Sequence, residues 1–569
     1  MNKRLLLSTA ILASMTATVT TAKTTISSEP AKQPNIIVIL ADDMGWSDIA
    51  PFGSEIKTPN LQTLADNGVK FTNFHATPYS GPSRAALLTG TDPHLVGVGN
   101  LSEITTKEQR EGNPQGYAGY LNDKAVTVAE YLKGAGYHTI MSGKWHLGTN
   151  DEQDASQKGF DKSFTMIRGE YYHFPSQTTQ DGKQVVYGNY KDPNGLKMYR
   201  LNGKYIDEPA NFFSSDSYTD FLIQEINNRP ANKPFFAYLA YTAPHSPLQA
   251  PQKFIDKYAG MYTDGPQALA NKRFNAVKKM GLINQNATAP ELIGTPEWSS
   301  LSQKERDEFA RRMQVYAAMV DNMDANIGRL MNDLKKRGEL ENTVIMFMSD
   351  NGAAGAFREG DKRWGAWVNE THNNSFANMG RANSYISTGP DWAQASNTPF
   401  SLFKGYTSEG GMRSPLIIAG AQISKGKISG SYSNITDITP TVLDIAGVKR
   451  ITPNGKAPVT GKSIVTQLKK STTKFEGPAQ PRVIESMGGK SVRMGNYKVL
   501  STSRFDTIHG LTSDKIVQDT WQLFDLAKDP GETKDIAKQN PRILEKMVKA
   551  YDDYAKEVGV VEVSPSKIQ

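Results

Sequence analysis

A serine and an arginine stand four positions apart in residues 79–90, and their spacing suits the binding or making of an anion. Ser80 and Arg84 are separated by Gly-Pro-Ser. Because Pro82 lacks a backbone N–H and suits the first helical position, we expect a helix over residues 83–88 that ends at Gly90. Ser80 would then precede a helix N-terminus, which favours negative charge. The alternative is an N-capping serine beside a surface arginine.

Two pairs of oxygen-bearing side chains follow apolar runs that read as buried strands. Asp42 and Asp43 come after residues 35–40, and Asp350 and Asn351 come after residues 343–348. Adjacent carboxylates repel each other and are costly to bury unless a cation lies between them. An oxygen-only ligand set suits a hard cation such as Ca²⁺ or Mg²⁺. Solvated loop aspartates are the alternative for either pair alone.

Cationic side chains and histidines follow two further predicted strands, and another lysine lies later in the chain. Lys144 and His146 come after residues 138–142, and if extended they would share a face. His245 follows residues 234–241 and is flanked by prolines, which restrict its loop. Lys404 precedes Glu409-Gly410-Gly411. An isolated Lys-x-His pair is more often surface decoration, and a lone histidine is more often structural.

The elements that must position these residues predict an α/β fold. Continuous β-branched runs with ligand residues at their ends are typical of a large mixed, mostly parallel sheet flanked by helices. We expect a long core helix over residues 305–337, and long loops over residues 150–215 and 353–403. A Pro-, Gly- and Lys-rich stretch at 449–480 predicts a boundary between a catalytic domain (34–448) and a small C-terminal domain (449–569) with an antiparallel sheet and one helix.

The composition and the N-terminal residues limit the cellular location and the kinds of partner that we expect for the chain. It has 569 residues, a net charge of +7 and no cysteine, so disulfides and thiolate metal sites are excluded. Its lysines and arginines are scattered, which argues against a nucleic-acid surface. Residues 1–22 carry Lys3 and Arg4, an apolar run and small residues at the end, as in a signal peptide. We therefore expect an exported protein, periplasmic or secreted, with no membrane anchor.

The motif Ser80-x-Pro82-Ser83-Arg84 followed by Thr89-Gly90 resembles the signature of the sulfatase family, and the other pieces resemble that family in the same order. The resemblance extends over most of residues 34–560, and residues 317–320 and 380–385 are most similar to secreted bacterial arylsulfatases of the Ser type. It implies an alkaline-phosphatase-like fold and the hydrolysis of sulfate esters, aryl sulfates among them. It also implies that a formylglycine-generating maturation enzyme oxidises Ser80 to 3-oxoalanine (formylglycine).

The resemblance further implies one Ca²⁺ per chain and a role for each motif residue. The metal ligands would be Asp42, Asp43, residue 80, Asp350 and Asn351. Arg84 would hold the hydrated aldehyde and the carboxylates, while Lys144 and Lys404 would bind sulfate oxygens. His245 would protonate the leaving oxygen, His146 would assist the collapse of the hydrate, and Asp350 could act as base. A sulfo-enzyme intermediate would form and release inorganic sulfate.

Two other functions stay open at this stage. A phosphodiester or phosphonate monoester hydrolase of the same superfold could carry the same residues, since both ester classes bear one negative charge. An unmodified protein that only binds sulfated ligands would differ solely in lacking the oxidation of Ser80. Aromatic residues in 164–190 and 364–392 could stack on a phenyl ring or a sugar. The sequence shows neither the oligomeric state nor the physiological ester.

Overall fold

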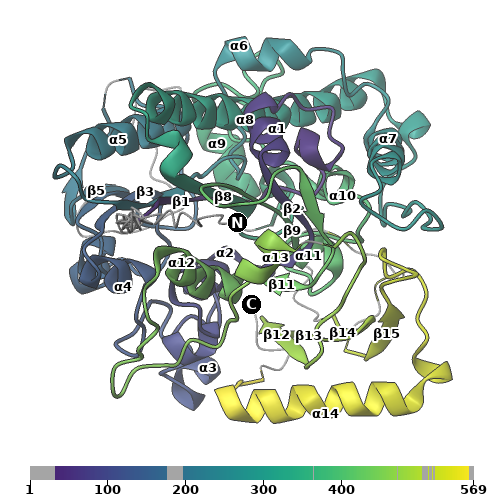
Figure 1. Cartoon of the computed structure of the whole chain (residues 1–569). Coiled ribbons are helices and arrows are strands. Elements are labelled where there is room, and N and C mark those ends of the chain that lie inside the picture. The colour runs from purple at the N-terminus through teal and green to yellow at the C-terminus, as the bar shows by residue number, and fades with distance from the viewer. Residues whose placement is uncertain are drawn as a thin grey trace, which may run out of the picture.

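The computed structural model of the chain is built around one large sheet with helices on both faces (Figure 1). It describes residues 33–562 apart from 176–196, 210, 363, 471, 503–510, 512–515 and 517–518. The predicted signal peptide lies outside the described residues. No helix in the part of the chain that is described is both long and apolar enough to cross a bilayer.

The large sheet has eleven strands in its described part, in the order β10-β2-β9-β8-β1-β7-β3-β4-β5-β6, with β11 also paired to β2. The central pairs β8–β1, β1–β7, β7–β3 and β3–β4 are parallel, whereas β9 runs antiparallel to both β8 and β2. The predicted mixed, mostly parallel sheet is therefore confirmed. The strands are β1 (Asn35–Ala41), β2 (Gly68–His75), β3 (His138–Lys144), β4 (Lys162–Met166), β5 (Tyr199–Leu201), β6 (Lys204–Ile206), β7 (Phe235–Ala240), β8 (Thr343–Ser349), β9 (Arg413–Gly420), β10 (Lys427–Ser429) and β11 (Ser433–Asn434).

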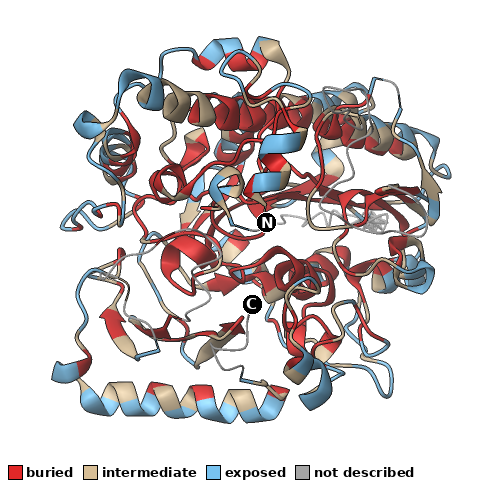
Figure 2. Cartoon of the chain, turned by 180° about the vertical axis from the view of Figure 1, so that it is seen from behind, coloured by how far each residue is buried: buried red, intermediate tan, exposed pale blue. Residues whose placement is uncertain are grey.

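The central strands β8, β1, β7 and β3 are buried throughout because each face of the sheet is covered by a separate core. In β1, Ile37 and Ile39 belong to one core, and Ile36, Val38 and Leu40 belong to the other. This alternation follows from the two-residue period of a strand. Figure 2 shows buried residues in the sheet and in the inward faces of the helices on both sides.

Helices α1, α5, α7 and α8 contribute to the first core, and α2, α4, α12 and α13 contribute to the second. The long helix α8 begins with a capping box at Ser302, and its predicted core stripe is buried. The helices are α1 (Pro59–Asp66), α2 (Ser80–Thr89), α3 (Lys107–Gly112), α4 (Val128–Gly134), α5 (Ser214–Asn228), α6 (Gln252–Ile255), α7 (Pro266–Lys279), α8 (Gln303–Lys336), α9 (Gly365–Thr371), α10 (Pro390–Ser396), α11 (Glu409–Met412), α12 (Ile438–Ala446), α13 (Val465–Lys469) and α14 (Pro541–Val558).

A second sheet lies below the first in Figure 1, with α14 along its outer side. It is antiparallel, in the order β12 (Arg482–Ser486), β13 (Gly489–Met494), β14 (Tyr497–Ser501) and β15 (Gln522–Asp525). Its own core includes Val492, Val499 and Leu523, which pack with Met547 and Tyr551 of α14. The expected small antiparallel sheet with one helix is thus present. The domain boundary at residue 449 stays a prediction, since Leu468 of α13 packs into the second core of the large sheet.

Three local expectations were wrong. Helix α2 begins at Ser80 and not at Ser83; a proline at its third position is tolerated because the first four N–H groups of a helix have no intrahelical acceptor. The stretch expected as loops at 150–215 contains β4 to β6, and α5 begins at its end. The stretch 353–403 contains α9 and α10, and its Trp392 is fully buried in the first core, where it cannot stack on a ligand.

Candidate active site

The residues singled out in the sequence meet at one edge of the large sheet. Strands β8, β1, β7 and β3 are neighbours, and the segments that follow β8, β1 and β7 begin or contain Asp350, Asp42 and His245. Lys144 is the last residue of β3. Parallel strands bring their carboxyl ends to the same edge, which is why ligand sites gather there. Helix α2 adds Ser80 from its first turn.

Ser80 occupies the centre of this group. Its hydroxyl lies 3.2 Å from Asp42 Oδ1, 3.3 Å from Asn351 Oδ1 and 3.5 Å from Lys144 Nζ. The side chain is almost completely buried, with 2 % of its surface exposed. Two oxygen acceptors and one cation therefore converge on a single hydroxyl oxygen, which is the arrangement needed to hold a reacting group in place.

Arg84 lies one helical turn from Ser80 and is fully buried. Its guanidinium donates to Asp350 Oδ2 at 2.8 Å and to the Lys144 backbone oxygen at 3.0 Å, and it lies 3.4 Å from Asp42 Oδ1. Burial opposes the charge of Arg84, but Tyr238 and the carboxylates of Asp350 and Asp42 raise its pKa. Arg84 thus connects the ends of β8, β1 and β3 through these contacts, and it stays charged.

Two lysines pair with the two adjacent aspartates. Lys144 Nζ donates to both oxygens of Asp42, at 2.9 and 2.7 Å, and Lys404 Nζ donates to Asp43 at 2.8 Å. Burial alone would raise the pKa of the Asp42 carboxyl, but Lys144 and the other nearby cations hold it well below its usual range. Burial lowers the pKa of Lys144, whereas the carboxylates, led by Asp43, raise the pKa of Lys404 despite its burial.

Asp43 has a backbone conformation that most residues avoid. Its φ is +62°, in the left-handed region. Its N–H donates to Asp350 Oδ1 at 3.2 Å, its carbonyl accepts from the Tyr316 hydroxyl at 3.3 Å, and its Oδ1 accepts from Asn351 Nδ2 at 2.7 Å. The surroundings therefore hold the strained residue, and strain of this kind is concentrated at functional sites.

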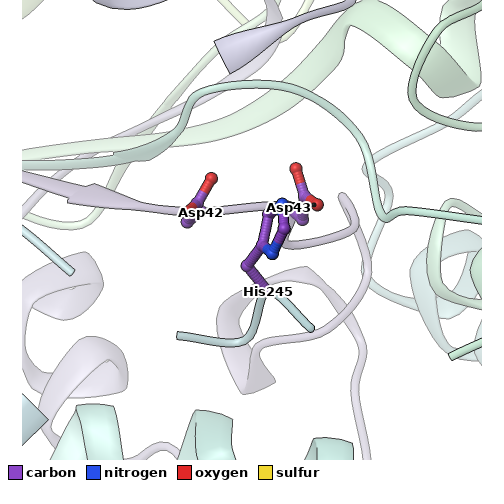
Figure 3. A group of neighbouring side chains, drawn as sticks. All are labelled: Asp42, Asp43 and His245. Carbon is purple, nitrogen blue, oxygen red and sulfur yellow. Dashed lines mark ion pairs between the residues drawn. The ribbon is translucent and has the colours of Figure 1, made fainter. Parts of the chain in front are cut away.

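His245 joins the aspartate pair from the loop after β7. Its Nε2 lies 3.3 Å from Asp43 Oδ2 and 3.4 Å from Lys404 Nζ, while its Nδ1 lies 2.7 Å from the Ser246 carbonyl oxygen. Because a carbonyl only accepts, Nδ1 carries the proton in this arrangement. Figure 3 shows the imidazole beside Asp43, with Asp42 next in the chain.

His146 does not share an extended face with Lys144, so that expectation was wrong. Its φ is +54°, which turns the chain after β3. Its Nε2 lies 3.2 Å from Glu103 Oε1, and its buried Nδ1 has no hydrogen-bond partner among the described residues. Gly169 leaves room for the ring, since a Cβ there would lie 2.7 Å from His146 Cε1. Burial lowers the pKa of His146 although Glu103 opposes this.

Glu103 is a site residue that the sequence did not single out. The segment around it, residues 101–104, contains no recognisable motif and no hydrophobic periodicity. Only the fold brings Glu103 next to His146. His146 lowers the pKa of Glu103 to about 2 although burial would raise it, so this carboxylate is ionised at neutral pH.

A cavity of about 250 Å³ opens above Ser80. Lys144, His146, His245 and Lys404 all line it, as the sequence-based roles require. Its lining includes an apolar wall and a charged wall. The apolar wall consists of Tyr79, Leu101, Ile104 and Met487, and the charged wall consists of Arg168, Glu170, Arg358 and Asp361 beside Trp364.

Comparison with known proteins identifies the family of this site. A family model described as Sulfatase matches residues 34–448, which include every residue of the central group. The chain belongs to the sulfatase family. It is 39% identical over 548 residues to an uncharacterized sulfatase of Schizosaccharomyces pombe, covering 93% of this chain and 95% of the relative. It is 37% identical over 433 residues to an arylsulfatase of Klebsiella aerogenes, covering 75% of this chain and 90% of the relative.

Solved structures agree with this assignment. The crystal structure of Ps i-CgsB in complex with k-i-k-neocarrahexaose superimposes with a TM-score of 0.62 at 25% identity, covering 92% of this chain and 93% of that chain. The protein is therefore a sulfuric ester hydrolase, and its fold is the alkaline-phosphatase-like fold that the motifs predicted.

The carboxylates around Ser80 in this sulfatase offer oxygen ligands for a cation. Three carboxylates, Asp42, Asp43 and Asp350, face three cationic side chains, and the contacts with Arg84, Lys144 and Lys404 balance them. The donors nearest Ser80 are all oxygen atoms, as hard divalent ions prefer. The described residues therefore fit the divalent metal that sulfatases generally use, and adding it would give the group the net positive charge that a sulfate ester needs.

Glu409, which completed the series of motifs, lies outside the cavity. It is fully buried and accepts from Lys498 Nζ at 3.0 Å, with Arg493 at 3.4 Å and His75 Nε2 at 3.0 Å. These cations lower the pKa of Glu409 well below its usual value, although burial opposes this. Since Lys498 and Arg493 lie on β14 and β13, Glu409 joins the small sheet to the segment that carries Lys404.

Proposed function

We propose that this sulfatase hydrolyses aryl sulfates and that residue 80 acts in the oxidised 3-oxoalanine form. The observation that supports this most directly is the position of the Ser80 hydroxyl, which lies within 3.5 Å of Asp42, Asn351 and Lys144 at the floor of the cavity. Plain serine would form a stable sulfate ester. The aldehyde supplies, as its hydrate, one oxygen to attack sulfur and a second hydroxyl whose collapse releases sulfate.

The metal that fits this group is calcium, held by the side chains of Asp42, Asp43, Asp350 and Asn351 together with residue 80. Calcium would supply a positive charge beside residue 80 that favours an ionised oxygen there. A zinc pair is a poorer match, because the donors next to Ser80 are oxygen atoms and Asn351 follows Asp350 where a histidine would be needed.

The cationic residues of this chain would bind the sulfate group. Lys144 and Lys404 both line the cavity and are held in place by Asp42 and Asp43. Fixed positive charges of this kind stabilise charge that develops on the sulfate oxygens in the transition state. Arg84 would orient residue 80 through the carboxylates it contacts.

The two histidines would divide the proton transfers. His245 lines the cavity, and its Nε2 faces Asp43 and Lys404, so it is our choice for the acid that protonates the leaving oxygen. His146 lies on the same cavity with Nε2 occupied by Glu103, and it would assist release of sulfate from residue 80. Asp350, held by Arg84, would serve as the base.

An aromatic leaving group is supported by the relative from Klebsiella aerogenes, an arylsulfatase, and by the apolar wall of the cavity. A saccharide ester is the other possibility, since the structural neighbour holds k-i-k-neocarrahexaose and the cavity also has a charged wall. Of the two aromatic regions expected to stack on a ligand, 364–392 contributes Trp364, and 176–190 lies outside the described residues.

Export and maturation complete the proposal. Residues 1–22 would direct the chain out of the cytoplasm to the periplasm or the medium, and a formylglycine-generating enzyme would oxidise Ser80. Residues 34–448 would form the catalytic domain and residues 449–569 the C-terminal domain.

The test is a pair of parallel assays on protein from the native host. The expected result is faster hydrolysis of 4-nitrophenyl sulfate than of bis(4-nitrophenyl) phosphate, with both activities absent from Ser80→Ala. A clear preference for the diester would show that the main reaction is phosphodiester hydrolysis and would contradict the proposal. Full activity in Ser80→Ala would remove residue 80 from the chemistry.

A further inference from the structure

The tip of the hairpin between β12 and β13 has an unusual residue for its geometry. Ser486 pairs with Gly489, which leaves Met487 and Gly488 as a two-residue turn. Both have positive φ, +54° and +81°. A two-residue turn of this kind favours asparagine, aspartate or glycine at both positions, because a Cβ is crowded in the left-handed region. Methionine at the first position is therefore an outlier that the hairpin itself does not need.

The hairpin is fixed to the catalytic unit on both sides of this tip. Gly488 N donates to Glu485 Oε1 at 2.8 Å, and Glu485 Oε2 lies 2.9 Å from His94 Nε2. On the other side, the Thr407 hydroxyl donates to the Lys490 carbonyl at 3.2 Å. Since Thr407 follows Lys404 by three residues, the hairpin lies against the segment that supplies a cavity lysine.

The side chain of Met487 points into the active site. It is 2 % exposed and lines the cavity above Ser80. It packs in a small apolar cluster with Tyr79, Leu101 and Ile104. Tyr79 directly precedes Ser80 and both line the cavity, so this apolar wall includes the neighbour of residue 80.

The charged wall gives the same cavity a second kind of lining. Arg168, Glu170, Arg358 and Asp361 line it. Arg358 lies 3.4 Å from Glu170 Oε2, and its guanidinium is 5.4 Å from the ring of Trp364. The leaving group of a sulfate held at residue 80 would therefore enter a cavity that offers both apolar and charged lining.

We propose that Met487 determines specificity by forming the leaving-group subsite with Tyr79, Leu101 and Ile104, and that this subsite selects esters with a flat apolar face such as an aromatic ring. A thioether is flexible and polarizable, and it makes favourable contacts with aromatic rings. An observed left-handed outlier at a pocket supports a functional reason for the residue. This inference rests on the proposed function, because it concerns the leaving group of that reaction.

The test compares Met487→Gly and Met487→Asn with the unaltered protein, using Met261→Asn as the control because Met261 is exposed and distant in the chain. Both variants suit the turn, which offsets the buried apolar contact that they lose, so we expect a melting temperature close to that of the unaltered protein. We expect kcat/KM for 4-nitrophenyl sulfate to fall about tenfold, the scale set by lost apolar contact in a specificity pocket. The inhibition constant of inorganic sulfate, which has no leaving group, should change less than twofold. Met487→Leu should restore most of the aryl activity.

Two results would overturn the subsite. One is an unchanged kcat/KM for 4-nitrophenyl sulfate in both turn-compatible variants. The other is a weakening of sulfate inhibition in step with the loss of aryl activity, since that would mean that the hairpin shapes the whole site. Failure of the proposed function looks different: the unaltered protein would then release no sulfate from 4-nitrophenyl sulfate, whichever residue stands at position 487.

Discussion

The ammonium group of Lys144 lies 2.7 Å from Asp42 Oδ2, so that a buried cation and a buried carboxylate share the space beside the Ser80 hydroxyl. The pair is fully buried. Removing Lys144 would leave the buried charge of Asp42 with Arg84 alone as an ion-pair partner among the described residues, which costs more than the net value of the pair. The contact also keeps Lys144 at the cavity, where it can reach a sulfate oxygen.

Replacing this lysine tests its role in binding the developing charge. We expect Lys144→Met to lower kcat for 4-nitrophenyl sulfate by about 100- to 1,000-fold, the cost of losing one preorganised stabilising group. Steady-state kinetics on the folded variant measures it. Lys107→Met is the matched control, because its side chain is 82 % exposed and pairs only with Glu111 in the described contacts. A drop below threefold at Lys144 would assign it a purely structural role.

Removal of divalent cations should abolish activity and lower stability together. A ligand that binds only the folded state at 100 times its Kd stabilises it by about 2.7 kcal/mol. Chelation should therefore lower the melting temperature, and Ca²⁺ should restore both properties. Asp43→Asn should raise the Ca²⁺ concentration that is needed, since Asp43 lies among the oxygen donors. Full turnover in chelated protein, with no metal detected by elemental analysis, would rule out the calcium site.

Glu103 should act through His146. Because a carboxylate only accepts, its contact with Nε2 places the proton on that nitrogen and leaves Nδ1 as an acceptor. A glutamine at position 103 could also donate, so Glu103→Gln permits the other tautomer. We expect kcat to fall by about 10- to 100-fold, within the range of a general acid–base contribution, with KM nearly constant.

The matched control is Glu111→Gln, an exposed acid with a lysine partner. Glu103→Asp should recover part of the lost kcat. A variant Glu103→Gln that raises KM and leaves kcat unchanged would show instead that Glu103 contacts the substrate, since it lines the same cavity.

Alkaline pH should weaken the attachment of the C-terminal unit. His94 lies between Asp92 at 3.1 Å and Glu485 at 2.9 Å. Burial opposes the charged ring, yet its hydrogen bonds to both acids raise the pKa of His94 to about 10. The tyrosines that pack on the ring, Tyr117 and Tyr554, stay neutral because burial raises their pKa values.

The folded-state pKa of His94 is above its unfolded value of 6.5. The contribution of His94 to the free energy of unfolding is therefore complete below pH 6.5 and is lost as pH rises toward 10. We expect the urea midpoint to fall over this range in the unaltered protein and to fall less steeply in His94→Gln. Parallel slopes in the two proteins would contradict the assignment.

Much of the fold and most of the central group could be predicted because the signals were local. Apolar runs such as residues 35–40 and 343–348 marked the buried strands, and the polar pairs at their ends were brought together by the parallel sheet. Helix α14 lies at Pro541–Val558, where its pattern predicted it. Ser80, Arg84 and Lys144 meet as the motif order suggested.

What escaped prediction depends on contacts between distant segments. Glu103 has no recognisable spacing, and only the turn at His146, with its positive φ, brings the two together. Met487 reaches the cavity because a hairpin about 400 residues after Ser80 in the sequence packs against the catalytic unit. Trp392 was expected near a ligand, but an aromatic residue in a polar stretch can equally fill the core, as it does here.

The measurement that tests the central claim most directly links the chemical state of residue 80 to sulfate release. Preparations with different degrees of maturation would be assayed for inorganic sulfate released from 4-nitrophenyl sulfate. The mass of the tryptic peptide of residues 71–84 would be measured in each preparation by mass spectrometry. We predict that the rate rises in proportion to the fraction of peptide that has lost two hydrogens at Ser80. Equal rates in fully oxidised protein and in protein with intact serine would contradict the account, as would fully oxidised, calcium-loaded protein that releases no sulfate.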